Sequence, residues 1–72
     1  MKREQWTLAL QSFASVVDRA ATVQSIEARH LLAMQCESIG GAVRYHGRRG
    51  DDLFELMMKF SRLIMSEERL EQ

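Results

Sequence analysis

The sequence contains no proline and only one cysteine, and both scarcities constrain the fold. Proline is the strongest helix breaker, so a 72-residue chain without it is suited to long helices. A single cysteine, Cys36, excludes a disulfide within the chain. A structural zinc site usually takes four ligands, and Cys36, His30 and His46 are one short of that number. We therefore expect no disulfide, no metal and no cofactor to stabilise this domain.

Net charge and long apolar runs are also lacking. The ten basic and ten acidic residues cancel, whereas nucleic-acid-binding domains usually carry a basic excess. The balance therefore argues against nucleic acid as the main partner. No apolar run approaches the roughly 20 residues of a membrane span or the roughly 7–15 residues of a signal-peptide core. We expect a cytoplasmic protein that does not contact a membrane.

The small size of the chain is the main reason to expect self-association. Hydrophobic residues make up 46% of the sequence, which is too apolar for a disordered chain. A single core of this size rarely supplies more than about 3–5 kcal/mol of stability. With disulfides and metals excluded, an oligomeric partner is the remaining source of stability. Two-fold homodimers are the commonest oligomers, so we expect a homodimeric helical bundle.

Apolar residues recur at spacings of three and four along three segments, which predicts an all-α, three-helix domain over residues 1–72. The helices are expected at about 3–21, 25–46 and 52–69, as an N-terminal helix followed by a helical hairpin. Ser25 is the expected N-cap of the second helix, although a continuous helix through residues 21–24 is an alternative. Gly40 and Gly41 lie inside the second pattern. The pattern keeps its phase there, which favours one continuous helix over a break.

The segment from Gly47 to Asp52 is the strongest turn signal in the sequence. Gly47 is placed to end the second helix in the left-handed conformation, and Gly50 to let the chain reverse. Asp51 is expected to cap the third helix. The Arg-Gly-Asp triplet at residues 49–51 is then part of a turn and a helix cap.

The third helix has an unusually wide apolar surface. Its polar positions form one narrow stripe: Glu55, Lys59, Arg62, Ser66 and Arg69. A surface helix in a monomer needs an apolar arc of only about 100°, and this one spans more than half the circumference. We therefore expect the helix to contact apolar neighbours on two sides, one of them a second chain. The residues assigned to this dimer surface are Phe54, Met57, Met58, Ser61 and Met65.

Basic and aromatic residues gather around the predicted turn. Arg44, Tyr45, Arg48 and Arg49 are of types that are enriched at protein interfaces. They are the expected contact surface for an acidic protein partner. Two alternatives are a solvated turn and a phosphate-binding cluster.

Catalytic chemistry has little support in the sequence. Cys36 and His46 lie about 15 Å apart along a continuous helix, and no phosphate-binding glycine loop follows a strand. We therefore expect no enzyme activity, no catalytic residues and no small-molecule substrate. The expected function is a small protein-binding regulator or adaptor, such as an inhibitor, anti-activator or chaperone of phage or plasmid type, that acts as a homodimer on a larger protein. A helix-turn-helix-like DNA-binding regulator and a structural subunit of a larger assembly are the alternatives.

Overall fold

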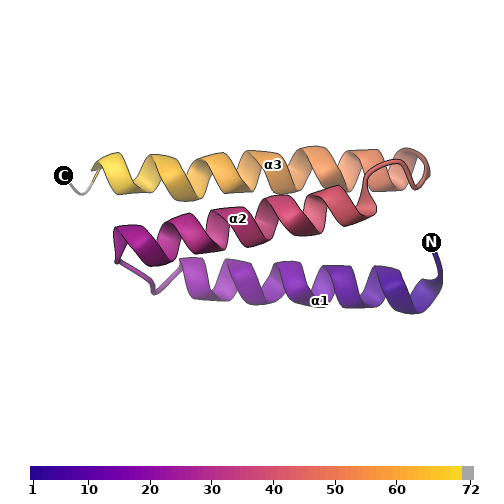
Figure 1. Cartoon of the computed structure of the whole chain (residues 1–72), viewed down its shortest axis with the longest axis horizontal. Coiled ribbons are helices and arrows are strands. Elements are labelled where there is room, and N and C mark those ends of the chain that lie inside the picture. Colours follow the sequence, from indigo (N-terminus) through magenta and orange to yellow (C-terminus); the bar gives the residue numbers. More distant parts are fainter. Residues whose placement is uncertain (71–72) are drawn as a thin grey trace.

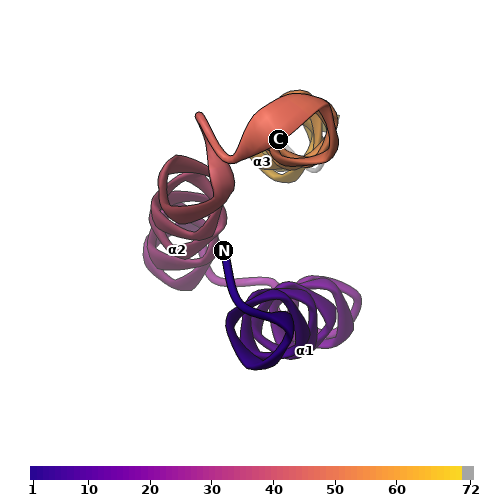
Figure 2. The same cartoon turned by 90° about the vertical axis from the view of Figure 1, so that its right-hand side faces the viewer.

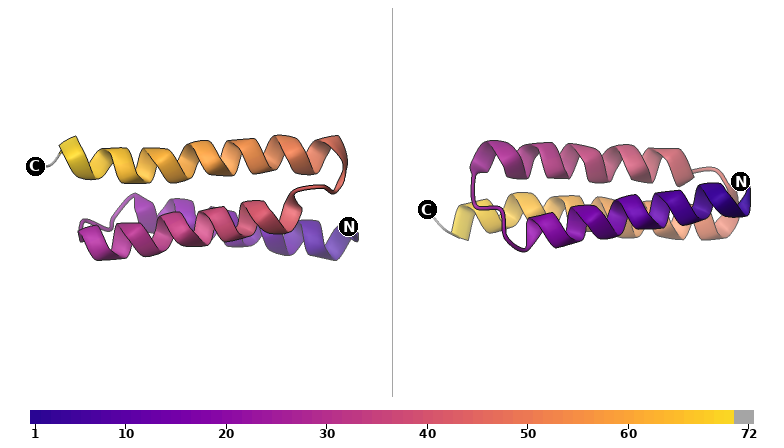
Figure 3. Two further views of the ribbon diagram at one scale, coloured as in Figure 1. Left: turned by 45° about the horizontal axis from the view of Figure 1, so that its top comes forward. Right: turned by 90° about the horizontal axis from the view of Figure 1, so that it is seen from below.

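The structure is a computed structural model that describes residues 1–70, with side chains up to Ser66. Three helices account for almost all of these residues: α1 (Arg3–Ala20), α2 (Ile26–Val43) and α3 (Gly47–Leu70). They alternate in direction, with the two connections at opposite ends (Figures 1 and 3). The expected all-α fold with three helices is confirmed. The side chain of Arg69, the last member of the predicted polar stripe, lies outside the described residues.

The first two helices begin and end close to the expected positions. The backbone N–H of Lys2 donates to Oε1 of Gln5 at 2.9 Å and organises the first turn of α1. The helix ends at Ala20, so the alternative of one continuous helix through residues 21–24 is wrong. Ser25 caps α2 as expected, because its hydroxyl accepts the backbone N–H of Ala28 at 3.4 Å.

Helix α2 continues through its glycine pair, as the phase of the pattern predicted. Gly40 faces α3, where an added Cβ would lie 3.3 Å from Cδ1 of Phe54 and 3.5 Å from Cβ of Met57. Gly41 has no such neighbour within 4 Å. Gly40 therefore lets α2 and α3 approach closely, whereas Gly41 faces outward. The helix ends at Val43, before the expected end at about residue 46.

The start of the third helix differs from the prediction, because α3 begins at Gly47 and not at Asp52. The loop is short, and both Tyr45 (φ 69°) and Gly47 (φ 78°) adopt the left-handed conformation. Gly50 is buried in the first turn of α3, where an added Cβ would collide with the carbonyl oxygen of Val43. Asp51 does not cap α3, because its Oδ1 accepts the backbone N–H of Tyr45 at 3.1 Å. Gly50 is thus a packing glycine that allows α3 to start directly against the end of α2.

Helix α2 occupies the middle of the fold, and α1 and α3 lie to the same side of it when viewed along the helices (Figure 2). The closest packing is between α2 and α3. The buried apolar residues come from all three helices: Val16, Ala20, Leu32, Ala33, Cys36, Val43, Met57 and Ile64. The molecule is elongated, with extents of 41 × 17 × 14 Å. The three helices therefore form an open arc, with α1 and α3 as its two edges.

Candidate functional site

The residues assigned to a dimer surface are divided between the interior and the surface. Met57 has no exposed surface, and Ser61 is buried with its hydroxyl donating to the carbonyl oxygen of Ala33 at 3.3 Å. Both contact α2 within the same chain, so they are not available to a second one in this conformation. Phe54, Met58 and Met65 are half-buried, and Phe54 and Met65 pack against the core.

The large exposed residues of α3 are instead two leucines that were not among the residues assigned to the dimer surface. Leu56 and Leu63 are 53% and 57% exposed. They are seven residues apart, which is close to two turns, so they share one face of the helix. This face points away from α2, because the α2-facing side of α3 carries Met57, Ser61 and Ile64. Surplus apolar surface is therefore present on α3, on a different stripe from the one expected.

The exposed leucines of α3 flank Phe60, the residue whose ring contacts α1. Leu10 is 38% exposed and Val17 is half-buried, and they too are seven residues apart on one face of their helix. Between the two helices, the rings of Phe13 and Phe60 meet edge to face, with centroids 5.6 Å apart and an interplanar angle of 80°. We call this surface the α1–α3 groove. Its rims are Leu10 and Val17 on α1 and Leu56 and Leu63 on α3, and the Phe13–Phe60 pair crosses its middle.

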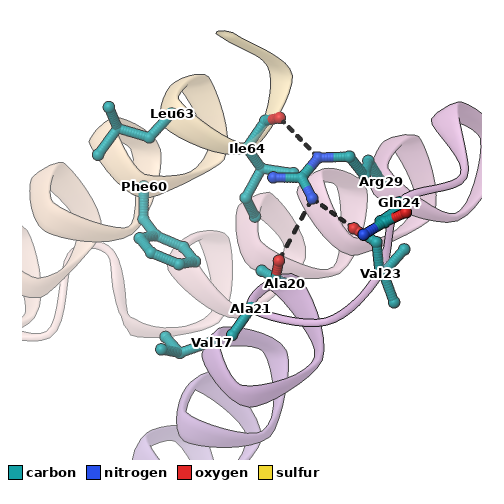
Figure 4. A pocket seen from close by; sticks show the side chains of 9 residues that line it. All are labelled: Val17, Ala20, Ala21, Val23, Gln24, Arg29, Phe60, Leu63 and Ile64. Atoms are coloured by element: carbon teal, nitrogen blue, oxygen red, sulfur yellow. Dashed lines mark hydrogen bonds between the residues drawn. The ribbon is translucent and has the colours of Figure 1, made fainter. Parts of the chain in front are cut away.

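One end of the α1–α3 groove deepens into a pocket of about 400 Å³ (Figure 4). Val17 and Ala20 line it from α1, and Phe60 and Leu63 line it from α3. The guanidinium of Arg29 forms part of its wall. The lining combines apolar side chains with the polar side chains of Gln24 and Arg29, which suits a contact with another protein side chain.

Arg29 is a buried polar residue that the sequence analysis missed. Its Nε donates to the carbonyl oxygen of Ile64 at 3.2 Å, and Nη1 donates to those of Ala20 at 3.3 Å and Val23. The guanidinium thereby joins the C-terminal end of α1 and the following loop to α3. Arginine also suits the negative end of a helix dipole. The available signal was its spacing of four from Ala33, which places it on the α3-facing side of α2.

The basic residues near the α2–α3 loop are held by aromatic rings and do not converge on one point. The guanidinium of Arg44 lies 4.7 Å from the ring centroid of Tyr45 and 4.4 Å from that of Phe54. The guanidinium of Arg49 lies 5.1 Å from the ring centroid of Trp6 on α1. Arg48 is exposed. Arg44 stacks on a ring of α3 and Arg49 on a ring of α1, so the four predicted partner-binding residues do not form a single phosphate clamp.

Tyr45 is the most exposed large apolar side chain among the described residues, at 78%. Its left-handed backbone conformation is unfavourable for a bulky residue. The bond from its N–H to Asp51 and the stacking of its ring on Arg44 hold it in place. Local strain of this kind often marks a functional position. We call Tyr45 together with Arg44 the loop pair.

A second groove lies between α1 and α2, on another face of α1. A pocket of about 440 Å³ there is lined by Leu8, Ser12, Ser38 and Ala42 among others. Leu8 is 63% exposed, and Met34 on the outer side of α2 is equally so. Small side chains alternate there with larger apolar ones such as Leu8 and Ile39.

The thiol of Cys36 is fully buried and donates to the carbonyl oxygen of Met57 at 2.9 Å. Burial raises the pKa of this thiol above its ordinary value of 9.0, against the lowering effect of a hydrogen bond with the Ser61 backbone. The negative charge of Glu37 raises the pKa further. A buried thiol of this kind is a poor nucleophile. His30 and His46 are exposed, and the described residues contain no group of three or more His, Cys, Asp or Glu placed to hold a metal.

Comparisons with known proteins add no assignment: no protein family, curated protein or solved structure matches the chain. Within the described part of the chain, no helix combines the length and apolar character that crossing a membrane requires.

Proposed function

We propose that this protein is a non-enzymatic, protein-binding regulator or adaptor that works as a helical homodimer on a larger protein. The observation that carries the proposal is the amount of surface that the chain leaves exposed. Its accessible area is 5269 Å², whereas a compact monomer of 8.3 kDa exposes about 4,600 Å². The chain therefore exposes more surface than a compact monomer of its mass.

The composition of the exposed surface supports the same proposal. Leu8, Leu31, Met34, Leu56 and Leu63 are all more than half exposed. Such residues are unremarkable when they are scattered singly, but contiguous apolar patches mark interaction sites. Leu56 and Leu63 share the α1–α3 groove, whereas Leu31 and Met34 lie one turn apart on α2. The protein therefore exposes large apolar side chains on two separate faces.

The loop pair is the proposed contact for the larger protein. Tyr45 projects from the end of the bundle, and Arg44 stacks on its ring. Tyrosine and arginine are the types that most often dominate binding energy at interfaces. A guanidinium covered on its faces by rings still directs its N–H groups outward from its edge, which suits a carboxylate. The proposed partner surface is therefore acidic, and binding to it is how an inhibitor, anti-activator or chaperone would act.

Two measurements test the proposal. Sedimentation equilibrium at micromolar concentration should give twice the monomer mass of 8.3 kDa. A pull-down from the native host should capture a protein with the wild-type chain and lose it with Tyr45→Asn, which keeps the left-handed backbone accessible. Leu31→Gln, a similarly exposed position on α2, serves as the control. A folded monomer that captures nothing would refute the proposed function.

A further inference from the structure

We propose that the α1–α3 groove is filled by a second copy of this chain, docked antiparallel about a two-fold axis that passes at the level of Phe13 and Phe60. The inference rests on the proposed function, because it names the face through which the homodimer forms. In this arrangement, α2 and the loop pair lie on the outside of the dimer.

The register of the groove is self-complementary, which a two-fold interface requires. Leu10 and Val17 lie on either side of Phe13 along α1, and Leu56 and Leu63 lie on either side of Phe60 along α3. The edge-to-face contact between Phe13 and Phe60 shows that these two midpoints are level with each other.

A two-fold rotation about an axis at right angles to the helices therefore pairs the rim residues of α1 with those of the partner's α1, and the rim residues of α3 with those of the partner's α3. Leu10 meets the partner's Val17, and Leu56 meets the partner's Leu63. Each exposed rim residue thus has an apolar counterpart.

Figure 2 shows α1 and α3 as the two edges of an arc, on the same side of α2. A second arc laid face to face on the first would give a four-helix core of α1, α3 and their two counterparts, with each α2 outside it.

A parallel dimer would also match apolar residues, because Leu10 would then face the partner's Leu56. Charge favours the antiparallel arrangement. The N-terminus of α1 and the α2–α3 loop lie at the same end of the bundle (Figure 1). This end carries five basic residues (Lys2, Arg3, Arg44, Arg48 and Arg49) and three acidic ones (Glu4, Asp51 and Asp52). A parallel dimer would bring two such ends together. The antiparallel dimer separates them along a molecule 41 Å long, several times the Debye length of about 8 Å at physiological salt.

The first experiment compares two glutamate variants by sedimentation equilibrium. Leu56→Glu places a charge in the groove, and Met34→Glu places the same charge at an equally exposed position on the outer side of α2. We expect Leu56→Glu to be a monomer, with a dissociation constant raised at least 100-fold, and Met34→Glu to remain a dimer. Circular dichroism at high protein concentration checks that both variants are helical, and Leu63→Glu provides a second groove variant if Leu56→Glu fails to fold.

The outcomes separate this inference from the proposed function. If the wild type is a dimer, Leu56→Glu remains one and Met34→Glu dissociates, the dimer uses the outer face of α2 and the inference is overturned while the proposed function stands. If the wild type is a monomer, this inference and the dimer in the proposed function both fail. Capture of a partner by the wild-type chain in the pull-down would then support the protein-binding part of the proposed function, and no capture would refute that part as well.

Cysteine pairs test the direction of docking, in a Cys36→Ala background. The antiparallel dimer brings Leu56 and the partner's Leu63 together, so Leu56→Cys with Leu63→Cys should form a disulfide-linked dimer on a non-reducing gel. The pair Leu10→Cys with Leu56→Cys meets across the interface only in the parallel dimer and should give no linked dimer. Linkage of the second pair, or of neither pair in a dimeric protein, would overturn the antiparallel register.

Discussion

The glycines around the α2–α3 packing allow the fold to be tested by adding one methyl group at a time. Gly41 lies inside α2 with no neighbour within 4 Å of an added Cβ. Gly50 lies in the first turn of α3, and an added Cβ there would collide with the carbonyl oxygen of Val43. The same chemical change therefore meets open space at one position and backbone at the other.

The expected magnitudes follow from these surroundings. Alanine is favoured over glycine inside a helix by about 0.8–1.0 kcal/mol, so Gly41→Ala should raise the free energy of unfolding by that amount. Gly50→Ala must displace the end of α2, because a carbonyl oxygen cannot turn aside as a flexible side chain can. Overpacking of this kind costs about 1–3 kcal/mol, a large share of the roughly 3–5 kcal/mol that a core of this size supplies.

Thermal unfolding followed by circular dichroism measures both effects. At one fixed protein concentration, Gly41→Ala should raise Tm by roughly 4–8 °C, and Gly50→Ala should lower it by more than that. The fixed concentration is needed because association with a second copy adds to the apparent stability. Urea unfolding of the same variants checks that the slope with denaturant is unchanged.

Two results would refute this reasoning. If Gly50→Ala were as stable as the wild type, α3 could not start against the end of α2 as described. If Gly41→Ala lowered the free energy of unfolding, or changed the oligomeric state measured by sedimentation, the outer face of α2 would be covered by another chain. The second result would also contradict the assignment of the dimer to the α1–α3 groove.

Three further perturbations test individual contacts. Arg29→Lys should lower the free energy of unfolding by about 2 kcal/mol or more, because lysine cannot reach the carbonyl groups that the guanidinium joins; wild-type stability in urea would contradict its joining role. Tyr45→Asn should change stability by less than about 1 kcal/mol, since relief of the left-handed strain offsets the lost stacking on Arg44, and a larger loss in urea would show that the loop pair is structural. Because burial raises the pKa of Cys36 above 9.0, the folded chain holds that proton more tightly than the unfolded one, so its contribution is intact below pH 9 and declines above it. Urea unfolding at pH 8 and 10 should show a decline that is smaller in Cys36→Ala, and equal declines would contradict the shift.

Local signals in the sequence predicted most of the helical architecture. The spacing of apolar residues located the helices, and Ser25 marked the start of α2 because an N-cap acts only on its own first turn. The phase of the pattern showed that α2 continues through Gly40 and Gly41. Each of these inferences concerns residues within a few positions of one another, where backbone propensity and periodicity decide the outcome.

The errors concern contacts between segments, which periodicity does not record. Gly50 has the composition of a turn residue, and its role is evident only once the carbonyl oxygen of Val43 is placed against it. Arg29 was not recognised as buried, because the carbonyl groups that it binds come from α1, a loop and α3. The same reason explains why Leu56 was not assigned to the dimer surface: most of α3 is apolar, and the positions of α1 and α2 determine which part of that surface is covered.

The attachment of α1 links the weakness of the single chain to its proposed dimer. Helix α1 packs less closely on α2 than α3 does. Its ring contacts with α3 are the edge of Phe13 on Phe60 and the stacking of Arg49 on Trp6. A second copy in the α1–α3 groove would cover Leu10 and Val17 together with the exposed leucines of α3, so α1 would be held by apolar surface on two sides. Dimer formation and the docking of α1 would then stabilise each other. This coupling would let a chain of 72 residues without an internal disulfide keep α1 packed on the other two helices.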